Sequence, residues 1–314
     1  MNYPVWELYY AGGGLLIALI AVVHVYVAHF AVGGGFFLVF TELKGRRENS
    51  EEILAYTKKH TRFFLLLTMV FGGVTGVGIW FTISLISPGA TSTLIHTFVF
   101  GFATEWVFFL CEITALLIYF YGFEKMSGNA HLTIGVLYAV FAWLSLFMIN
   151  GIIDFMLTPG KWIETRDFWD GFFNPTMWPA LFFRSALSLT LAGLFGFITA
   201  IFIRETQLRE TMVRHCAKWL MTPFFLMLPS AAWYFYSLPE APKAMILGRS
   251  PEIPRVVNIF ICLTFILFSG GLVMAARTPS SIKKPMAFGL LIIGLVYMGA
   301  FEWIRESGRR PYLI

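Results

Sequence analysis

The stretch "FATEWVFFLCEIT" (residues 102–114) decides the fold class, because it lies inside an apolar run, 94–121, with only two charged residues. A run of more than about 20 mostly apolar residues is long enough to cross the hydrocarbon core of a bilayer as a helix. The two exceptions, Glu105 and Glu112, are costly inside a membrane and are therefore candidates for function. The stretch predicts a transmembrane helix that carries two carboxyl groups.

Similar runs recur along the whole chain, which is 58% hydrophobic and 13% charged. A soluble domain has roughly twice this charged content, about 25%. Hydropathy predicts eight spans: 12–40, 63–86, 94–121, 132–157, 180–203, 219–237, 256–276 and 285–304. These runs are too long for barrel strands, and a spanning segment must satisfy its own backbone hydrogen bonds, so they are helices. We expect an all-α integral membrane protein of about eight transmembrane helices, arranged as two four-helix bundles over residues 1–158 and 159–314.

The basic residues predict the orientation of the chain in the membrane. Connections on one face, at 42–62, 122–131, 204–219 and 277–284, hold 14 Lys and Arg residues, and those on the other face hold eight. The positive-inside rule assigns the richer face to the cytoplasm, so both termini are expected outside. The net charge of +5 is ordinary for a membrane protein and gives no indication of a nucleic-acid partner.

Spacing sorts the ionisable residues inside the spans. Glu105 and Glu112 are seven residues apart, which places them on one face of a helix at a separation of about 10 Å. A line of proton carriers would have this arrangement, and so would two protonated acids that only hydrogen-bond to neighbouring helices. Glu302 and Glu306 share a face near the outer surface, where one could be a metal ligand, or both could extend to the interface. Arg184 falls inside the fifth span.

The histidines divide into two groups. His24 and His29 lie in the first span, about 140° apart around the helix, so they cannot readily bind one metal together. A lone intramembrane histidine is either a helix–helix hydrogen-bonding group or a haem ligand, and spacing alone does not decide between the two. The other three in question, His60, His131 and His215, lie at span boundaries, where a solvated or capping role is expected.

Several segments together resemble subunit I of the cytochrome bd oxidases, and they occur in that family's order. They are "AVVHVYVAHFAVGGGFFL" (21–38), "GGVTGVG" (72–78), "TEWVFFLCEITALLIYFYGFEKM" (104–126), "HLTIGVLYAVFAWLSLFMINGIIDFMLTP" (131–159) and "EWIRESGRRPY" (302–312). The resemblance is strongest over residues 15–160, weak from 160 to 280, and returns in the last dozen residues.

The resemblance implies a helical membrane oxidase that binds haem and reduces O₂ to water. His24 matches the family's first-helix histidine, an axial haem ligand, and Glu306 matches a glutamate that binds the iron of another high-spin haem. Arg309 matches an arginine beside the haem propionates. Glu105 and Glu112 match glutamates of proton delivery and the haem surroundings. Three further cofactor-binding candidates are His29, Arg184 and Glu302.

The chain also departs from the family pattern, and the departures change what is expected. The fifth span has Phe183 or Arg184 where a low-spin haem ligand should be. The long quinol-binding loop is replaced by about 19 residues at 237–255. The sequence therefore resembles a shortened, quinol-loop-lacking member that carries high-spin haem b, with haem d left open.

Such a subunit would lie in the cytoplasmic (inner) membrane of a bacterium or archaeon, within a complex of other membrane subunits. Because the quinol site is missing, we expect electrons to come from a c-type cytochrome partner. Two alternatives remain at this point: a non-catalytic bd-like scaffold or electron-transfer subunit of a respiratory complex, and a haem-free proton conduit. A haem spectrum distinguishes the oxidase from the conduit.

Overall fold

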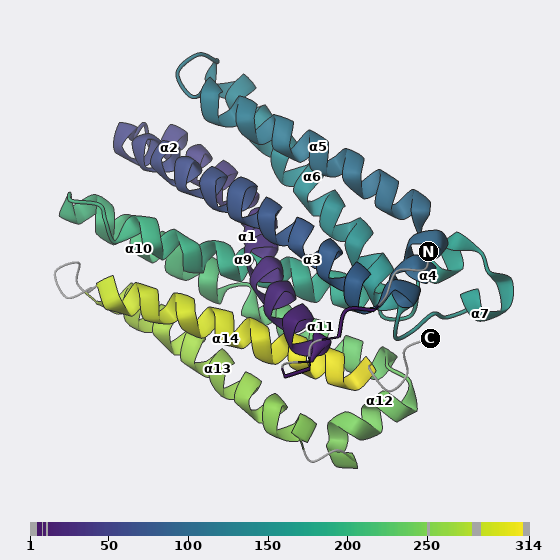
Figure 1. Cartoon of the computed structure of the whole chain (residues 1–314). Coiled ribbons are helices and arrows are strands. Elements are labelled where there is room, and N and C mark those ends of the chain that lie inside the picture. The colour runs from purple at the N-terminus through teal and green to yellow at the C-terminus, as the bar shows by residue number, and fades with distance from the viewer. Residues whose placement is uncertain (1–4, 8, 11, 250–251, 278–283, 310–314) are drawn as a thin grey trace.

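The structure, a computed structural model, describes residues 5–7, 9–10, 12–249, 252–277 and 284–309, and within this part the regular elements are all helical (Figure 1). Among the described residues, seven helical segments are long and apolar enough to cross a membrane. They are α1 (Gly13–Arg47), the continuous segment of α2 (Glu51–Leu65), η1 (Leu66–Gly72) and α3 (Gly73–Ile86), then α5 (Val99–Gly122), α6 (Gly128–Phe155), α9 (Met177–Ala200), α13 (Glu252–Ala276) and α14 (Lys284–Arg309). The expected all-α membrane fold is confirmed.

The sixth expected span, 219–237, is part of two consecutive helices, α10 (Thr206–Met221) and α11 (Phe224–Ser237). The break falls at Thr222 and Pro223, and proline is well suited to a helix start because it has no N–H to leave unsatisfied. Both helices pack against α9. Together they occupy the place of an eighth helix, so the expected number of about eight agrees with the structure.

The second membrane segment begins at Glu51, well before its apolar run at residue 63. Ser50 caps it, because its hydroxyl accepts a hydrogen bond from the backbone N–H of Ile53 at 3.3 Å. The first four turns carry Lys58, Lys59 and Arg62, which hydropathy alone assigns to a loop. The segment then passes through the π-helical turns of η1, at residues 66–72, before α3 begins.

The helices form two groups that meet along α1 and α9. The first group contains α1, α2–α3, α5 and α6, and the second contains α9, α10–α11, α13 and α14. α9 is the most deeply buried of the membrane helices. Its contact with α1 is close at Gly33, where an added Cβ would overlap the backbone carbonyl of Ser188. Glycine is therefore required at this crossing, since any side chain would push the two helices apart.

The two ends of the molecule differ in character (Figure 1). α1 begins and α14 ends at one end, together with the short helices α4 (Pro88–Thr97), α7 (Trp162–Thr165), α8 (Phe168–Phe172), α12 (Glu240–Ala244) and the π-helical turn η2 (Met245–Arg249). The basic connections at 42–62, 122–131 and 204–219 lie at the opposite end, which we call the basic end, and α13 ends and α14 begins there too. Most of the fourth, 277–284, lies outside the described residues. α1 therefore begins, and α14 ends, away from the basic end; that the end where they do so faces outward stays a prediction.

Candidate functional site

The two carboxyl groups of α5 both face α6. Ser145 donates a hydrogen bond to Oε1 of Glu105 at 2.7 Å, and the hydroxyl of Tyr138 lies 3.2 Å from Oε1 of Glu112. Their partners on α6, Tyr138 and Ser145, are also seven residues apart. The later residue on α5 contacts the earlier one on α6, so the two helices are antiparallel. Glu105 and Glu112 share one helix face, as their spacing predicts.

The hydroxyl of Tyr138 also lies 3.0 Å from the backbone oxygen of Ala31 on α1. A phenol carries one proton, so Tyr138 can donate to only one of its two neighbouring oxygens at a time. When it donates to Ala31, its oxygen can accept a hydrogen bond from a protonated Glu112. This contact can therefore exist with Glu112 either ionised or neutral, as a proton carrier requires.

His24 lies between α1 and α3, with its ring packed against Gly76, where an added Cβ would be 3.1 Å from the ring carbon Cε1. Its Nδ1 is 3.1 Å from the hydroxyl oxygen of Thr75. The Thr75 hydroxyl donates its own proton to a backbone carbonyl one turn earlier, at Phe71 or Gly72, so its oxygen accepts from His24. The proton of the neutral imidazole is thereby fixed on Nδ1, and the lone pair of Nε2 is free for a metal.

His29 has the same tautomer in a more buried position. It is only 3% exposed, and its Nδ1 donates to the backbone oxygen of Val25 at 2.8 Å. Its Nε2 is buried with no hydrogen-bond partner among the described residues. Unpaired buried nitrogen atoms are rare in folded proteins and call for an explanation such as a ligand. His29 also interacts electrostatically with Arg184 and Glu302.

A buried charged cluster joins α9 and α14. Glu302 accepts two hydrogen bonds at its Oε2 from Arg305, at 2.8 Å from Nε and 2.5 Å from Nη2. Its Oε1 lies 3.9 Å from Nη1 of Arg184, which is only 4% exposed. One carboxylate thus stabilises two guanidinium groups within the membrane region. We call Arg184, Glu302 and Arg305 the arginine cluster.

Glu306 lies one turn beyond Glu302 on α14 and is half-buried. α14 runs antiparallel to α1, because Tyr26 donates to the backbone oxygen of Leu291 at 2.8 Å and Gly299 lies opposite Val22. Glu306 is therefore near the start of α1, whereas His24 faces α3, so these two expected iron ligands lie on different sides of α1. Arg309 ends α14; its side chain and residues 310–314 lie outside the described part of the structure.

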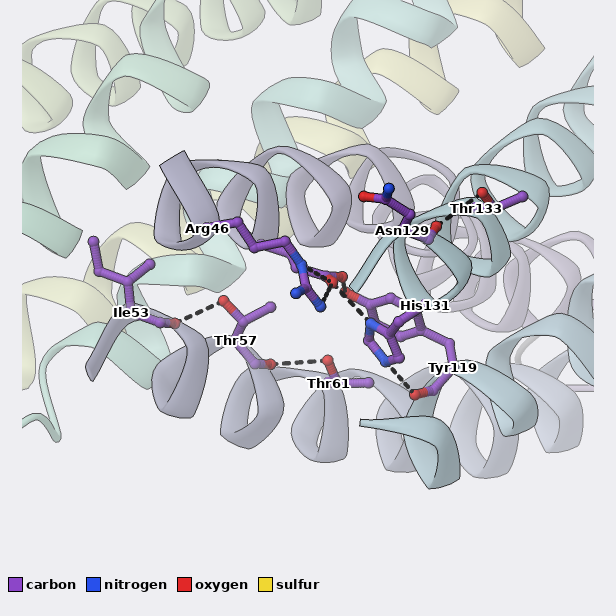
Figure 2. Close-up of polar contacts among 9 residues, drawn as sticks. Arg46, Ile53, Thr57, Thr61, Tyr119, Asn129, His131 and Thr133 are labelled. Carbon is purple, nitrogen blue, oxygen red and sulfur yellow. Dashed lines mark hydrogen bonds and ion pairs between the residues drawn. The ribbon is translucent and has the colours of Figure 1, made fainter. Parts of the chain in front are cut away.

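Sequence reasoning missed a fourth polar group, at the basic end (Figure 2). Glu42 of α1 is fully buried, and its carboxylate accepts from Arg46 at 2.8 Å, from Tyr119 at 2.7 Å and from His131 at 2.9 Å. His131 is also fully buried, so the expectation of a solvated or capping role was wrong. The only local signal was the four-residue step from Glu42 to Arg46, which puts both on one helix face.

The two other boundary histidines also bond inside the fold. His60 is fully buried with Nδ1 2.7 Å from the Thr199 hydroxyl, and His215 is half-buried with Nε2 3.1 Å from the Thr41 hydroxyl. The solvated or capping role is wrong for His60 as well. Burial lowers the pKa of His215, which is outside the spanning segments, to about 4. His215 is therefore neutral at physiological pH.

Replacement of Glu302 by glutamine is expected to destabilise the protein by about 3–5 kcal/mol, because it removes the carboxylate that faces the guanidinium groups of both Arg184 and Arg305. The matched control is Glu240→Gln, which breaks an exposed pair with Lys243 on α12 and should change stability by less than about 1 kcal/mol. Thermal unfolding of both variants in the same detergent measures the difference. Equal unfolding temperatures for the two variants would contradict this assignment.

Together, these features define a helical, multi-pass membrane protein that buries titratable side chains between its helices. Residues 15–237 match the sequence family described as cytochrome bd terminal oxidase subunit I. Because the match covers well over half of the chain, the protein belongs to this family. The expected family membership is confirmed.

A solved structure supports the same fold. The chain is similar to a chain of the bd oxidase from Geobacillus thermodenitrificans, with a TM-score of 0.80, 18% sequence identity, and coverage of 96% of this chain and 87% of that one. No curated protein matches the sequence significantly. At this identity, the likeness to the solved structure shows the fold, and the roles of individual residues rest on their own geometry.

Proposed function

We propose that this protein is the haem-binding subunit of a bd-type terminal oxidase that reduces O₂ to water within a complex of membrane subunits. The observation that carries the proposal is the state of the two histidines of α1. His24 and His29 each have Nδ1 as the donor, so each has a lone pair on Nε2 that is available to a metal. Neutral imidazole in this tautomer is a common form of haem ligand.

The donor set fits a haem. His24 is held by Thr75 against Gly76, and His29 has an orphaned, buried Nε2, so both are preorganised for a ligand. The cofactor we propose is high-spin haem b, with haem d as the alternative at a second iron. When bound, the haem supplies iron that takes up O₂ and passes electrons to it. Glu306 would hold the second iron through a carboxylate oxygen, a hard ligand.

The remaining candidates control charge around the site. Arg184 is buried beside His29, and Arg309 follows Glu306 by less than one turn of α14. Both guanidinium groups suit anionic haem propionates, because Arg recognises carboxylates in a bidentate manner. Glu302 fixes the position of Arg184 and Arg305. In this proposal, the half at residues 1–158 holds His24 and the proton route, and the half at 159–314 ends with Glu306.

Reduction of O₂ consumes protons, and the proposal assigns their delivery to Glu105 and Glu112. Both lie on the α6 face of α5, and each contacts a hydroxyl that can donate or accept. When these carboxyl groups take up and release protons in turn, a proton passes along α5 from one glutamate to the other while the backbone stays in place. The electrons are proposed to come from a c-type cytochrome partner at the end of the molecule where α14 ends, the end to which Glu306 is closest.

A reduced-minus-oxidised spectrum of the purified complex, before and after addition of CO, tests the proposal. The expected result is a high-spin haem signal that CO shifts, because one face of the iron must be open for O₂. Absence of haem would favour the proton conduit or the scaffold, and haem that does not respond to CO would favour an electron-transfer subunit. Comparing oxygen consumption with reduced c-type cytochrome and with quinol then tests the electron donor.

A further inference from the structure

Glu105 and Glu112 are seven residues apart on α5, and Tyr119 follows Glu112 at the same spacing. On α6, His131 precedes Tyr138 by the same seven residues. These residues also meet. The rings of Tyr119 and His131 stack with centroids 4.2 Å apart, and Nε2 of His131 lies 2.8 Å from the backbone oxygen of Tyr119. α5 and α6 therefore carry three polar contacts at equal intervals, the third at the basic end (Figure 2).

The hydrogen bonds around His131 show how many protons His131 and Glu42 share. The backbone oxygen of Tyr119 only accepts, so Nε2 of His131 carries a proton. Its Nδ1 lies 2.9 Å from Oε1 of Glu42, and this contact between two acceptors also needs a proton. Glu42 and His131 together therefore hold one proton more than a neutral imidazole beside an ionised carboxylate.

We propose that Glu42 and His131 form the proton-loading site of the oxidase, from which the carboxylates of α5 are supplied. The inference rests on the proposed function. A proton from water at the basic end binds between Nδ1 of His131 and Oε1 of Glu42. The pair gives this proton up toward Glu112, the pair becomes a neutral imidazole and a carboxylate, and the next proton from water restores it.

The groups around the pair suit this cycle. Arg46 on α1 and the hydroxyl of Tyr119 on α5 donate to the carboxylate of Glu42, so its negative charge remains stabilised after the proton has left. α2 contributes Thr57 and Thr61, whose hydroxyls donate to carbonyls of their own helix (Figure 2). Successive contacts are about 10 Å apart along the helix axis, so the inference requires bridging water between them.

His131→Gln in the complex, reconstituted into liposomes, tests the inference. Glutamine can still hydrogen-bond to Glu42 but cannot exchange a proton at this position. We expect proton uptake during O₂ reduction to slow at least tenfold while haem content and helicity stay unchanged. His215→Gln is the control, because His215 lies at the same end and bonds to Thr41, next to Glu42. A folded His131→Gln variant with the wild-type uptake rate would overturn the inference.

Two further variants keep the test decisive. Tyr119→Phe keeps the shape of the ring and removes one hydrogen bond to Glu42, so the variant should fold and the pair should hold its proton more tightly. The midpoint of proton uptake should shift upward by about half a pH unit to one unit, and an unchanged midpoint would overturn the inference. Glu112→Gln tests the route itself: uptake that is lost in Glu112→Gln but normal in His131→Gln would leave the proposed function intact and remove only the loading site.

Discussion

Replacement of His24 by alanine is expected to abolish a high-spin haem signal from the spectrum of the complex. The side chain is the only part of α1 that offers an imidazole lone pair toward α3, and Thr75 already holds the ring in the tautomer that a metal requires. Without the imidazole, nothing at this position can bind the iron. The CO-induced change assigned to that haem should be lost with it, because it needs a five-coordinate iron.

His96→Ala provides the matched control for this prediction. His96 is an exposed histidine on α4 whose hydrogen bonds, within the described part of the chain, go to Ser92 of the same helix: to its backbone oxygen at 2.7 Å and its hydroxyl at 3.4 Å. Its removal should leave the spectrum and the haem content unchanged. Helicity measured by circular dichroism shows whether each variant is folded. A folded His24→Ala variant with the wild-type spectrum would remove His24 from the site, and His29 would then be the remaining histidine of α1 to examine.

Replacement of Gly33 by valine is expected to cause a large loss of stability, because the new side chain forces α1 and α9 apart. A Cβ at this position would overlap the backbone of Ser188, and a backbone atom cannot turn away as a flexible side chain can. Overpacking in protein cores typically costs about 1–3 kcal/mol, and a clash between two helix backbones lies at or above the upper end of this range.

Gly14→Val is the corresponding control, because Gly14 lies on the same helix and an added Cβ there would have no neighbour within 4 Å among the described residues. Thermal unfolding in detergent should show a large drop for Gly33→Val and almost none for Gly14→Val. Similar unfolding temperatures for the two variants would mean that α1 and α9 can separate without loss, and the role assigned to this crossing would be wrong.

The sequence predicts much of the fold because a bilayer restricts the possible structures so strongly. Length and hydropathy are sufficient to locate seven membrane helices, and the seven-residue spacing correctly places Glu105 and Glu112 on one face. Hydropathy does not predict the break at Pro223, because the apolar run at 219–237 continues across it from α10 into α11. Hydropathy also does not predict the start of α2 at Glu51, because the first turns of this helix are amphipathic and precede the apolar run.

Pairings between distant residues could not be predicted in this way. Glu42 and His131 are 89 positions apart, and each is near the end of an apolar run, where a charged residue normally meets water. Only the packing of α1 against α6, and of α5 against α6, shows that both are buried. The same holds for Arg184, whose partner Glu302 is on another helix. Spacing within one helix is visible in a sequence, but the register between helices is not.

The arginine cluster has a consequence for how the chain is made. α9 leaves the ribosome with Arg184 about two turns inside its start, long before Glu302 on α14 has been synthesised. An arginine at the centre of a lipid-exposed helix costs about 2.5–3.5 kcal/mol on insertion scales, and one two turns from the helix end is still unfavourable. The newly inserted α9 therefore depends on the helices already present to shield this charge, and its final position is secured only after translation has finished.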